Sequence, residues 1–206
     1  MVTRFECLKA LAGFIGEAPV ILGTGAVEEE WVSLRPEGRL RLALGSVTPV
    51  ALGLALAQPK LPVVALDADG SVLINLASLV TLGQERPGNL KVFVLDNECY
   101  ESIGGMPSAT GTHCDLASMA RAAGVERAVT TRTLEEFRRA AKAAMSEEAL
   151  HFVVAKVEKG AKRLPQVPTD GIEMKYRFVR YLEARTGARV ISPPTQEMPK
   201  ELFREN

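Results

Sequence analysis

The feature that most constrains the fold is a series of short runs that are apolar throughout and alternate with helical segments. The apolar runs lie at residues 19–22, 40–44, 61–66, 91–95, 127–130 and 151–157. The helical segments between them lie at 48–58, 71–84, 115–123 and 134–145. Strands without a polar face are buried on both sides, and intervening helices permit parallel connections. The sequence therefore predicts an α/β fold, a doubly wound parallel sheet with helices on both faces.

The start of the chain predicts one more helix. Four apolar residues recur there at helical spacing: Phe5, Leu8, Leu11 and Ile15. Because Glu6 and Lys9 interrupt the apolar run, we interpret this segment as an amphipathic surface helix and not as a secretory leader. No apolar stretch of the sequence is long and clean enough to span a bilayer, so we expect no membrane association.

The sequence changes character after residue 160. Polar residues and prolines predict a linker, and residues 172–185 then predict an amphipathic helix with one face formed by Ile172, Tyr176, Val179 and Leu182. Three prolines and many charges follow Ser192 and predict an extended or disordered tail. We therefore expect an α/β domain over residues 1–160, and a linker, helix and tail over 161–206 that pack on the domain or leave it.

Composition limits the possible partners and the compartment. Lys and Arg number 25, as do Asp and Glu, so no strong positive field favours nucleic acid. The three cysteines, Cys7, Cys99 and Cys114, are far apart and have neither zinc-site nor disulfide-framework spacing. A reducing compartment is the simplest match, and we expect a cytoplasmic protein.

An acidic segment follows one of the buried strands. The stretch VVALDADGSVLIN covers residues 63–75 and places Asp67, Asp69 and Gly70 at the end of a strand. A second strand ends 26 residues after Gly70 in Asp96 and Asn97. In a parallel sheet these two strand ends meet at the same edge, which is where ligands bind in such folds.

Three interpretations of this segment stay open on residues alone. A haloacid-dehalogenase-like phosphatase would use Asp67 as the nucleophile, although no downstream Lys and acidic pair follow. Alternatively, Asp69 and Asn97 supply oxygen ligands to Mg²⁺ beside a diphosphate, with Ser71 as the N-cap of a helix whose N-terminus faces the phosphates. In the third interpretation Asp69 and Asn97 only cap a helix and a turn.

A resemblance favours the second interpretation. ALDADGS and DNECYESIGG, with 25 residues between Gly70 and Asp96, resemble the Gly-Asp-Gly…Asn-Asn signature of thiamine diphosphate enzymes. The wider pattern over about residues 1–185 is similar to the diphosphate-binding half of the sulfopyruvate and phosphonopyruvate decarboxylases. The resemblance implies a thiamine diphosphate- and Mg²⁺-dependent lyase that decarboxylates a small 2-oxo acid.

The resemblance also implies which residues bind metal and diphosphate. Asp69 and Asn97 would bind Mg²⁺ through their side chains, and Cys99 would bind it through its backbone carbonyl. Three further positions would contact the diphosphate: Gly70, Ser71 and the backbone near Ser102.

Other implied roles concern the rest of the cofactor. The segment Gly45, Ser46 and Val47 would contact the aminopyrimidine, with the Gly45 carbonyl as a hydrogen-bond acceptor and Val47 as the bulky residue that bends the cofactor. Gly25, in a turn of small residues, would let the backbone approach it. The sequence departs from the family pattern at Ala68, Thr48, Ile103 and Met106, and these changes bear on the substrate.

The implied site is incomplete in this chain. Enzymes of this family carry the activating glutamate on a separate pyrimidine-binding domain, and 206 residues leave room for one such domain. The resemblance therefore implies an α-type partner subunit and a hetero-oligomer, although the isolated chain could form a homodimer. The acidic run Glu28–Glu30 is interpreted as a solvated helix face.

One residue of this chain is a candidate for direct catalysis. His113 lies in the loop that could reach a substrate, and the alternative is a solvent-exposed loop residue. A second functional hypothesis remains open, in which the chain is a non-catalytic subunit with an assembly role.

Overall fold

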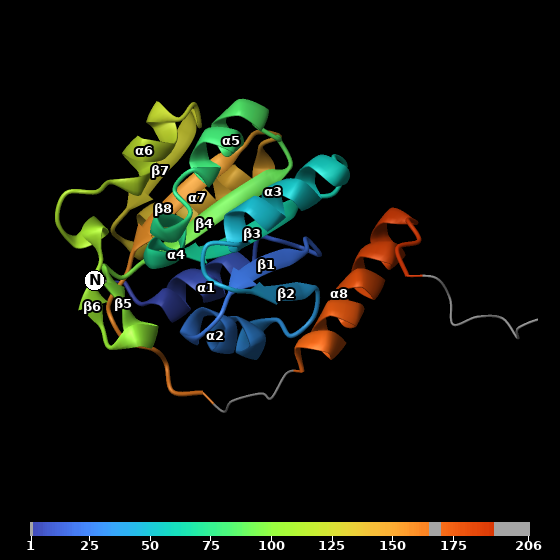
Figure 1. The fold of residues 1–206 in the computed structure, drawn as a ribbon, viewed down its shortest axis with the longest axis horizontal. Helices are drawn as coiled ribbons and strands as arrows, with labels where there is room; N and C mark the ends of the chain where they lie inside the picture. Colours follow the sequence, from blue (N-terminus) through green and yellow to red (C-terminus); the bar gives the residue numbers. More distant parts are fainter. Residues whose placement is uncertain (1, 165–169, 192–206) are drawn as a thin grey trace, which may run out of the picture.

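Six parallel strands form one central sheet in the computed structural model, which describes residues 2–164 and 170–191 (Figure 1). The order across the sheet is β2-β1-β3-β4-β8-β7, and every pairing is parallel. The strands are β1 (Val20–Gly23), β2 (Arg39–Leu42), β3 (Val63–Ala68), β4 (Leu90–Asp96), β7 (Arg127–Thr131) and β8 (His151–Lys156). The predicted doubly wound parallel sheet is confirmed.

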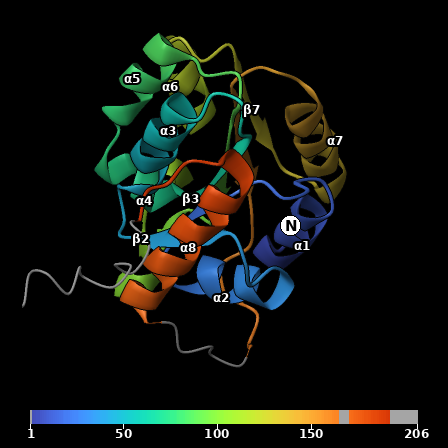
Figure 2. The ribbon, with the colours of Figure 1, turned by 90° about the vertical axis from the view of Figure 1, so that its right-hand side faces the viewer.

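Two helical layers cover the sheet, which explains why its central strands lack a polar face. One apolar core lies under α3 (Val47–Ala57), α5 (Ser78–Glu85) and α6 (Leu116–Ala122). The second lies under α1 (Arg4–Ala12), α2 (Ala26–Leu34) and α7 (Leu134–Ser146). Figure 2 shows α3, α5 and α6 on one side of the molecule and α1 and α7 on the other. All of β4 and nearly all of β3 and β8 are buried as a result.

The predicted C-terminal helix is present as α8 (Gly171–Thr186), and it packs beside the edge strand β2 (Figure 2). The prediction of which residues of this helix face the domain was wrong in part. Met174 and Phe178 are buried, whereas Ile172 and Tyr176 are exposed. Tyr181 donates a hydrogen bond from its hydroxyl to the carbonyl of Glu17 at 2.7 Å and ties the helix to the domain. The tail predicted from Ser192 onward lies outside the described residues.

The helix expected at 71–84 is two helices. The first, α4 (Asp69–Ile74), begins two residues earlier than expected, and its N-cap is Ala68. The prediction that Ser71 caps this helix was therefore wrong. The chain leaves helical geometry at Asn75, whose side-chain amide donates to the carbonyl of Gly45 at 2.9 Å, and α5 begins at Ser78.

The segment that follows β4 has a defined fold. A short antiparallel hairpin pairs β5 (Cys99–Tyr100) with β6 (Met106–Pro107), and 3₁₀ turns cover Glu101–Ile103 and Ala109–Gly111. None of the helices in the described ranges is long and apolar enough to cross a membrane.

The strand order creates a crevice at one edge. The chain passes from β1 outward to β2 and then returns to β3 on the opposite side of β1. The loops that follow β1 and β3 therefore leave the sheet in opposite directions. Crevices of this kind, outside the carboxyl ends of parallel strands, are where open α/β sheets bind ligands.

Candidate functional site

The crevice holds a cavity of about 470 Å³, which we call the switch-point pocket. Its walls come from the carboxyl ends of β1, β3 and β4 and from the hairpin that follows β4. Seven of the residues predicted to bind metal or cofactor line it: Gly25, Asp69, Gly70, Ser71, Asn97, Cys99 and Ser102. The volume falls within the range of about 300–1,000 Å³ that is usual for small-molecule and cofactor pockets.

Asp69 is the carboxylate of this pocket. It is the first residue of α4, and only 1% of its surface is exposed. Its Oδ2 accepts a hydrogen bond from the hydroxyl of Ser108 at 2.5 Å and lies 3.3 Å from the hydroxyl oxygen of Thr110. Burial raises the pKa of the Asp69 carboxyl, the Ser108 hydroxyl opposes that shift, and the nearby Asp96 carboxylate adds to it.

Asn97 and Cys99 lie at the end of the neighbouring strand. The side-chain oxygen of Asn97 accepts the backbone N–H of Cys99 at 3.2 Å, which closes a tight turn directly after β4. Glu98, between them, has a positive φ of 61°. This turn directs the chain back over the pocket and into the β5–β6 hairpin.

Two glycines bring the backbone close to the pocket. Gly25 has a φ of 86°, and a Cβ built there would meet no atom within 4 Å, so its position is open. A Cβ on Gly70 would instead overlap the ring of Tyr100, which also lines the pocket. Gly70 is therefore needed for the contact between α4 and the hairpin.

The segment predicted to contact the aminopyrimidine lies outside the pocket lining. Leu44 reaches the pocket, whereas Gly45, Ser46 and Val47 do not line it. Val47 is fully buried in the core. Gly45 donates its N–H to the Ser71 hydroxyl at 2.9 Å, and the Gly45 carbonyl already accepts the Asn75 amide. Their roles toward a cofactor stay predictions.

Asp67 does not have the exposure that a nucleophile needs. Only 1% of its surface is exposed. Its Oδ2 accepts the hydroxyl of Thr48 at 2.7 Å and the Thr48 N–H at 3.2 Å, and its Oδ1 accepts the N–H of Ala68 at 3.0 Å. Asp67 ties β3 to the start of α3, so the geometry does not support the phosphatase interpretation.

The acidic run on α2 is not the solvated face that the sequence suggested. Glu30 is buried and pairs with the guanidinium of Arg4, with Arg4 Nε and Glu30 Oε2 3.0 Å apart. Glu28 is also buried and pairs with Arg41 at 3.1 Å. Arg4 lines the switch-point pocket and also contacts Glu101 of the hairpin loop at 3.3 Å. Local charge patterning missed these pairs because their members are far apart in sequence.

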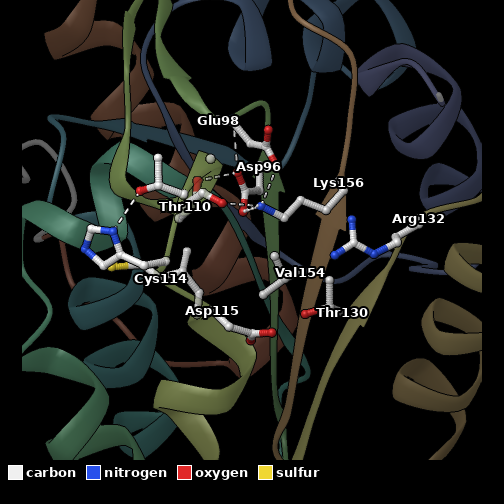
Figure 3. Close-up of a pocket in the computed structure, with 13 residues that line it drawn as sticks. Asp96, Glu98, Thr110, Cys114, Asp115, Thr130, Arg132, Val154 and Lys156 are labelled. Carbon is white, nitrogen blue, oxygen red and sulfur yellow. Dashed lines mark hydrogen bonds and ion pairs between the residues drawn. The ribbon is translucent and has the colours of Figure 1, made fainter.

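His113 lines a different cavity, of about 290 Å³, which we call the Lys156 pocket. Figure 3 shows this pocket, with Lys156 and Asp96 labelled. His113 is exposed, and its Nδ1 is 2.9 Å from the hydroxyl of Thr112. It does not line the switch-point pocket. The structure therefore does not bring His113 together with Asp69 and Asn97, and a catalytic role for it stays a prediction.

The donor atoms at the switch-point pocket fit a hard divalent cation. A carboxylate, an amide oxygen and a backbone carbonyl are oxygen ligands of the kind that Mg²⁺ prefers while it shares phosphate oxygens and water. The described residues contain no group of three or more His, Cys, Asp or Glu side chains placed to bind a metal. A cation here would thus need ligands from a bound phosphate or from water as well.

Comparison with known proteins identifies the family. Residues 36–155 match the family model for "Thiamine pyrophosphate enzyme, C-terminal TPP binding domain". The chain is 31% identical over 185 residues to sulfopyruvate decarboxylase subunit beta of Methanocaldococcus jannaschii, an alignment that covers 87% of this chain and 97% of the relative. It is 34% identical over 163 residues to phosphonopyruvate decarboxylase of Streptomyces viridochromogenes, covering 77% of this chain and 41% of that protein.

Solved structures agree on the fold. A thiamin diphosphate-dependent enzyme from Mycobacterium smegmatis superposes with a TM-score of 0.66 at 18% identity, over 77% of this chain. Benzoylformate decarboxylase from Polynucleobacter necessarius superposes with a TM-score of 0.64 at 20% identity, over 78% of this chain. This chain spans about a third of the length of each, 32% and 34%. The protein belongs to the thiamine pyrophosphate enzyme family, of which it carries the C-terminal, cofactor-binding domain.

Proposed function

We propose that this chain is the diphosphate-binding subunit of a thiamine diphosphate- and Mg²⁺-dependent decarboxylase of small 2-oxo acids. The observation that carries the proposal is the convergence of Asp69, Asn97 and Cys99 on one pocket from two neighbouring strand ends. Relatives named sulfopyruvate decarboxylase subunit beta match along nearly their whole length, and they support a substrate of the sulfopyruvate or phosphonopyruvate kind.

The residues of this chain would bind and orient the cofactor. Asp69 and Asn97 would bind Mg²⁺ through side-chain oxygens, and Cys99 would bind it through its carbonyl. The backbone at Gly70, Ser71 and Ser102 would contact the diphosphate. When bound, thiamine diphosphate supplies the electron sink for the charge that remains after carbon dioxide leaves.

Apolar residues of the same pocket would exclude water from the reacting centre. Val27 and Leu95 are buried in its wall, and Leu44 is partly exposed at it. A dry site strengthens the electrostatic interactions within it.

A second subunit would complete the site. The acidic residues that line the switch-point pocket are Glu29, Asp69 and Glu101. Asp69 is assigned to the metal, Glu101 contacts Arg4, and Glu29 is also engaged in an interaction of its own. We therefore assign the glutamate that activates the pyrimidine to a pyrimidine-binding partner chain, in agreement with relatives that are named as beta subunits.

The test is a calorimetric titration of the full chain with thiamine diphosphate, with and without Mg²⁺, alone and together with the pyrimidine-binding subunit. We expect Mg²⁺-dependent binding that strengthens with the partner. Asp69→Asn should weaken this Mg²⁺-dependent binding of thiamine diphosphate. The loss should exceed the factor of about 10 to 100 that is typical when a residue hydrogen-bonded to a metal ligand is removed. Glu126→Gln, at an exposed carboxylate, is the control.

Activity then separates catalysis from assembly. The complex should release carbon dioxide from sulfopyruvate or phosphonopyruvate faster than from pyruvate. Binding of the cofactor without turnover of any 2-oxo acid would favour the non-catalytic assembly subunit. Absence of cofactor binding to the complex would refute the proposal.

A further inference from the structure

A chain of buried polar contacts runs from Asp69 to the Lys156 pocket. Figure 3 shows the end of this chain formed by Thr110, Asp96 and Lys156. The Thr110 hydroxyl donates to Asp96 Oδ1 at 2.7 Å, and the Ser108 and Thr110 hydroxyl oxygens are 2.8 Å apart. Asp96 Oδ2 in turn accepts the ammonium of Lys156 at 2.9 Å. Ser108, Thr110, Asp69 and Asp96 are all buried, so this network is held in a low-dielectric environment.

We propose that Ser108 and Thr110 are positioning residues that fix the Asp69 carboxylate for metal binding, and that Lys156 fixes them in turn through Asp96. The proposal rests on the proposed function, because it concerns the same metal site. Both hydroxyl oxygens lie near the same oxygen of Asp69, Oδ2, Ser108 at 2.5 Å and Thr110 at 3.3 Å. These contacts, with the backbone N–H of Gly70, which also donates to the carboxyl, restrain the orientation in which Asp69 meets a ligand.

The proton count distinguishes the two hydroxyls. Each hydroxyl can donate one proton. Thr110 lies closer to Asp96, at 2.7 Å, than to Asp69, at 3.3 Å, so its proton goes to Asp96. Ser108, at 2.5 Å, is then the main donor to Asp69. Ser108 holds the carboxylate directly. Thr110, held by Asp96 and by the contact of Lys156 with its carbonyl, packs against the Ser108 oxygen and separates two buried acidic groups.

Lys156 has no donor left for a ligand in its own pocket. Its ammonium contacts Asp96 Oδ2, Glu98 Oε1 and the carbonyl of Thr110, each at 2.9 Å. An ammonium has three donors, and these three acceptors use them all. Lys156 therefore neutralises Asp96 and holds the backbone of Thr110. It acts as the fixed end of the network and is not a binding group of the pocket that it lines.

The sequence offers matched substitutions for a test. Ser108→Ala and Thr110→Val each remove one hydroxyl with little change of volume, and Thr110→Ser keeps the hydroxyl. Thr112→Val is the control, because Thr112 lies in the same segment but is exposed, and its hydroxyl donates to the carbonyl of Ala109.

The measurement is the Mg²⁺ affinity of the full chain in the presence of thiamine diphosphate, by calorimetry, with the partner subunit added if the wild type requires it. Ser108→Ala should weaken Mg²⁺ binding by about 10- to 100-fold, the usual effect of losing an outer-shell partner. Thr110→Val should also weaken it, by less, while Thr110→Ser and Thr112→Val stay near the wild type.

Thermal unfolding of the metal-free variants separates positioning from simple loss of fold. We expect Ser108→Ala and Thr110→Ser to unfold close to the wild type while their Mg²⁺ affinities differ. Equal Mg²⁺ affinity in the wild type, Ser108→Ala and Thr110→Val would overturn this inference and leave the proposed function intact. A wild type that binds neither Mg²⁺ nor thiamine diphosphate would overturn both.

Discussion

Replacing Arg4 by methionine should destabilise the fold strongly, because it leaves a buried carboxylate without its cation. The side chains of Arg4 and Glu30 are 7% and 2% exposed. The Arg4 guanidinium also donates to the carbonyl of Gly160 at 3.1 Å and contacts Glu101 at 3.3 Å. One side chain thus joins α1 to α2, to the hairpin after β4 and to the segment that follows β8.

The magnitude follows from what remains around Glu30. After Arg4→Met, the backbone N–H of Lys162 is still placed to donate to Glu30, at 2.8 Å. One neutral donor does not replace a buried cation, and breaking a buried ion pair by removing one partner costs about 3–5 kcal/mol. Glu101 is partly exposed, so its lost pair adds less than about 1 kcal/mol. We expect the free energy of unfolding to fall by about 3–5 kcal/mol.

Urea unfolding of three variants measures this effect. The double variant Arg4→Met, Glu30→Leu should be more stable than Arg4→Met alone, because it removes the uncompensated charge. Arg177→Met is the control, since the Arg177–Glu173 pair lies on the exposed surface of α8 and should contribute at most about 0.5 kcal/mol. An Arg4→Met loss no larger than that of the control, or a double variant no more stable than Arg4→Met, would refute the reasoning.

Two further predictions concern packing and pH. Gly83→Ala should destabilise the protein by about 1–3 kcal/mol, because its Cβ would overlap the carbonyl of Ala123. Gly53→Ala, with open space at its Cβ, should instead stabilise helix α3 by about 0.5–1 kcal/mol, and thermal unfolding of both compares them directly. Burial, assisted by the Lys91 ammonium, lowers the pKa of His151 from 6.5, so the unfolded chain binds the extra proton more readily. Stability should therefore fall as the pH drops through the window below 6.5, and His151→Gln should show a smaller fall. An equal pH dependence in the two proteins would contradict this assignment.

The fold class could be predicted from the sequence because strands that are buried on both faces consist mainly of apolar residues. The middle residues of β3, β4 and β8 are apolar, since helices cover both sides of these strands. The same pattern placed Asp69 and Asn97 at the ends of two strands, and neighbouring parallel strands bring such ends together. Periodicity alone located α8 but did not settle which of its faces is buried, because that depends on the surface it packs against.

Contacts between distant segments were decided only by the tertiary structure. Ser108 meets Asp69 across 39 residues, and Lys162 meets Glu30 across 132 residues. Nothing in the local sequence distinguishes Ser108 from the other hydroxyl residues of its segment, or Glu30 from a solvated acidic residue. Local sequence patterns indicate whether a segment is buried or exposed. A hydrogen bond or an ion pair depends instead on where the folded chain places two particular atoms. The sequence by itself therefore determined the sheet, the strand ends and the metal-binding candidates, and the folded chain alone decided which side chains hold them in place.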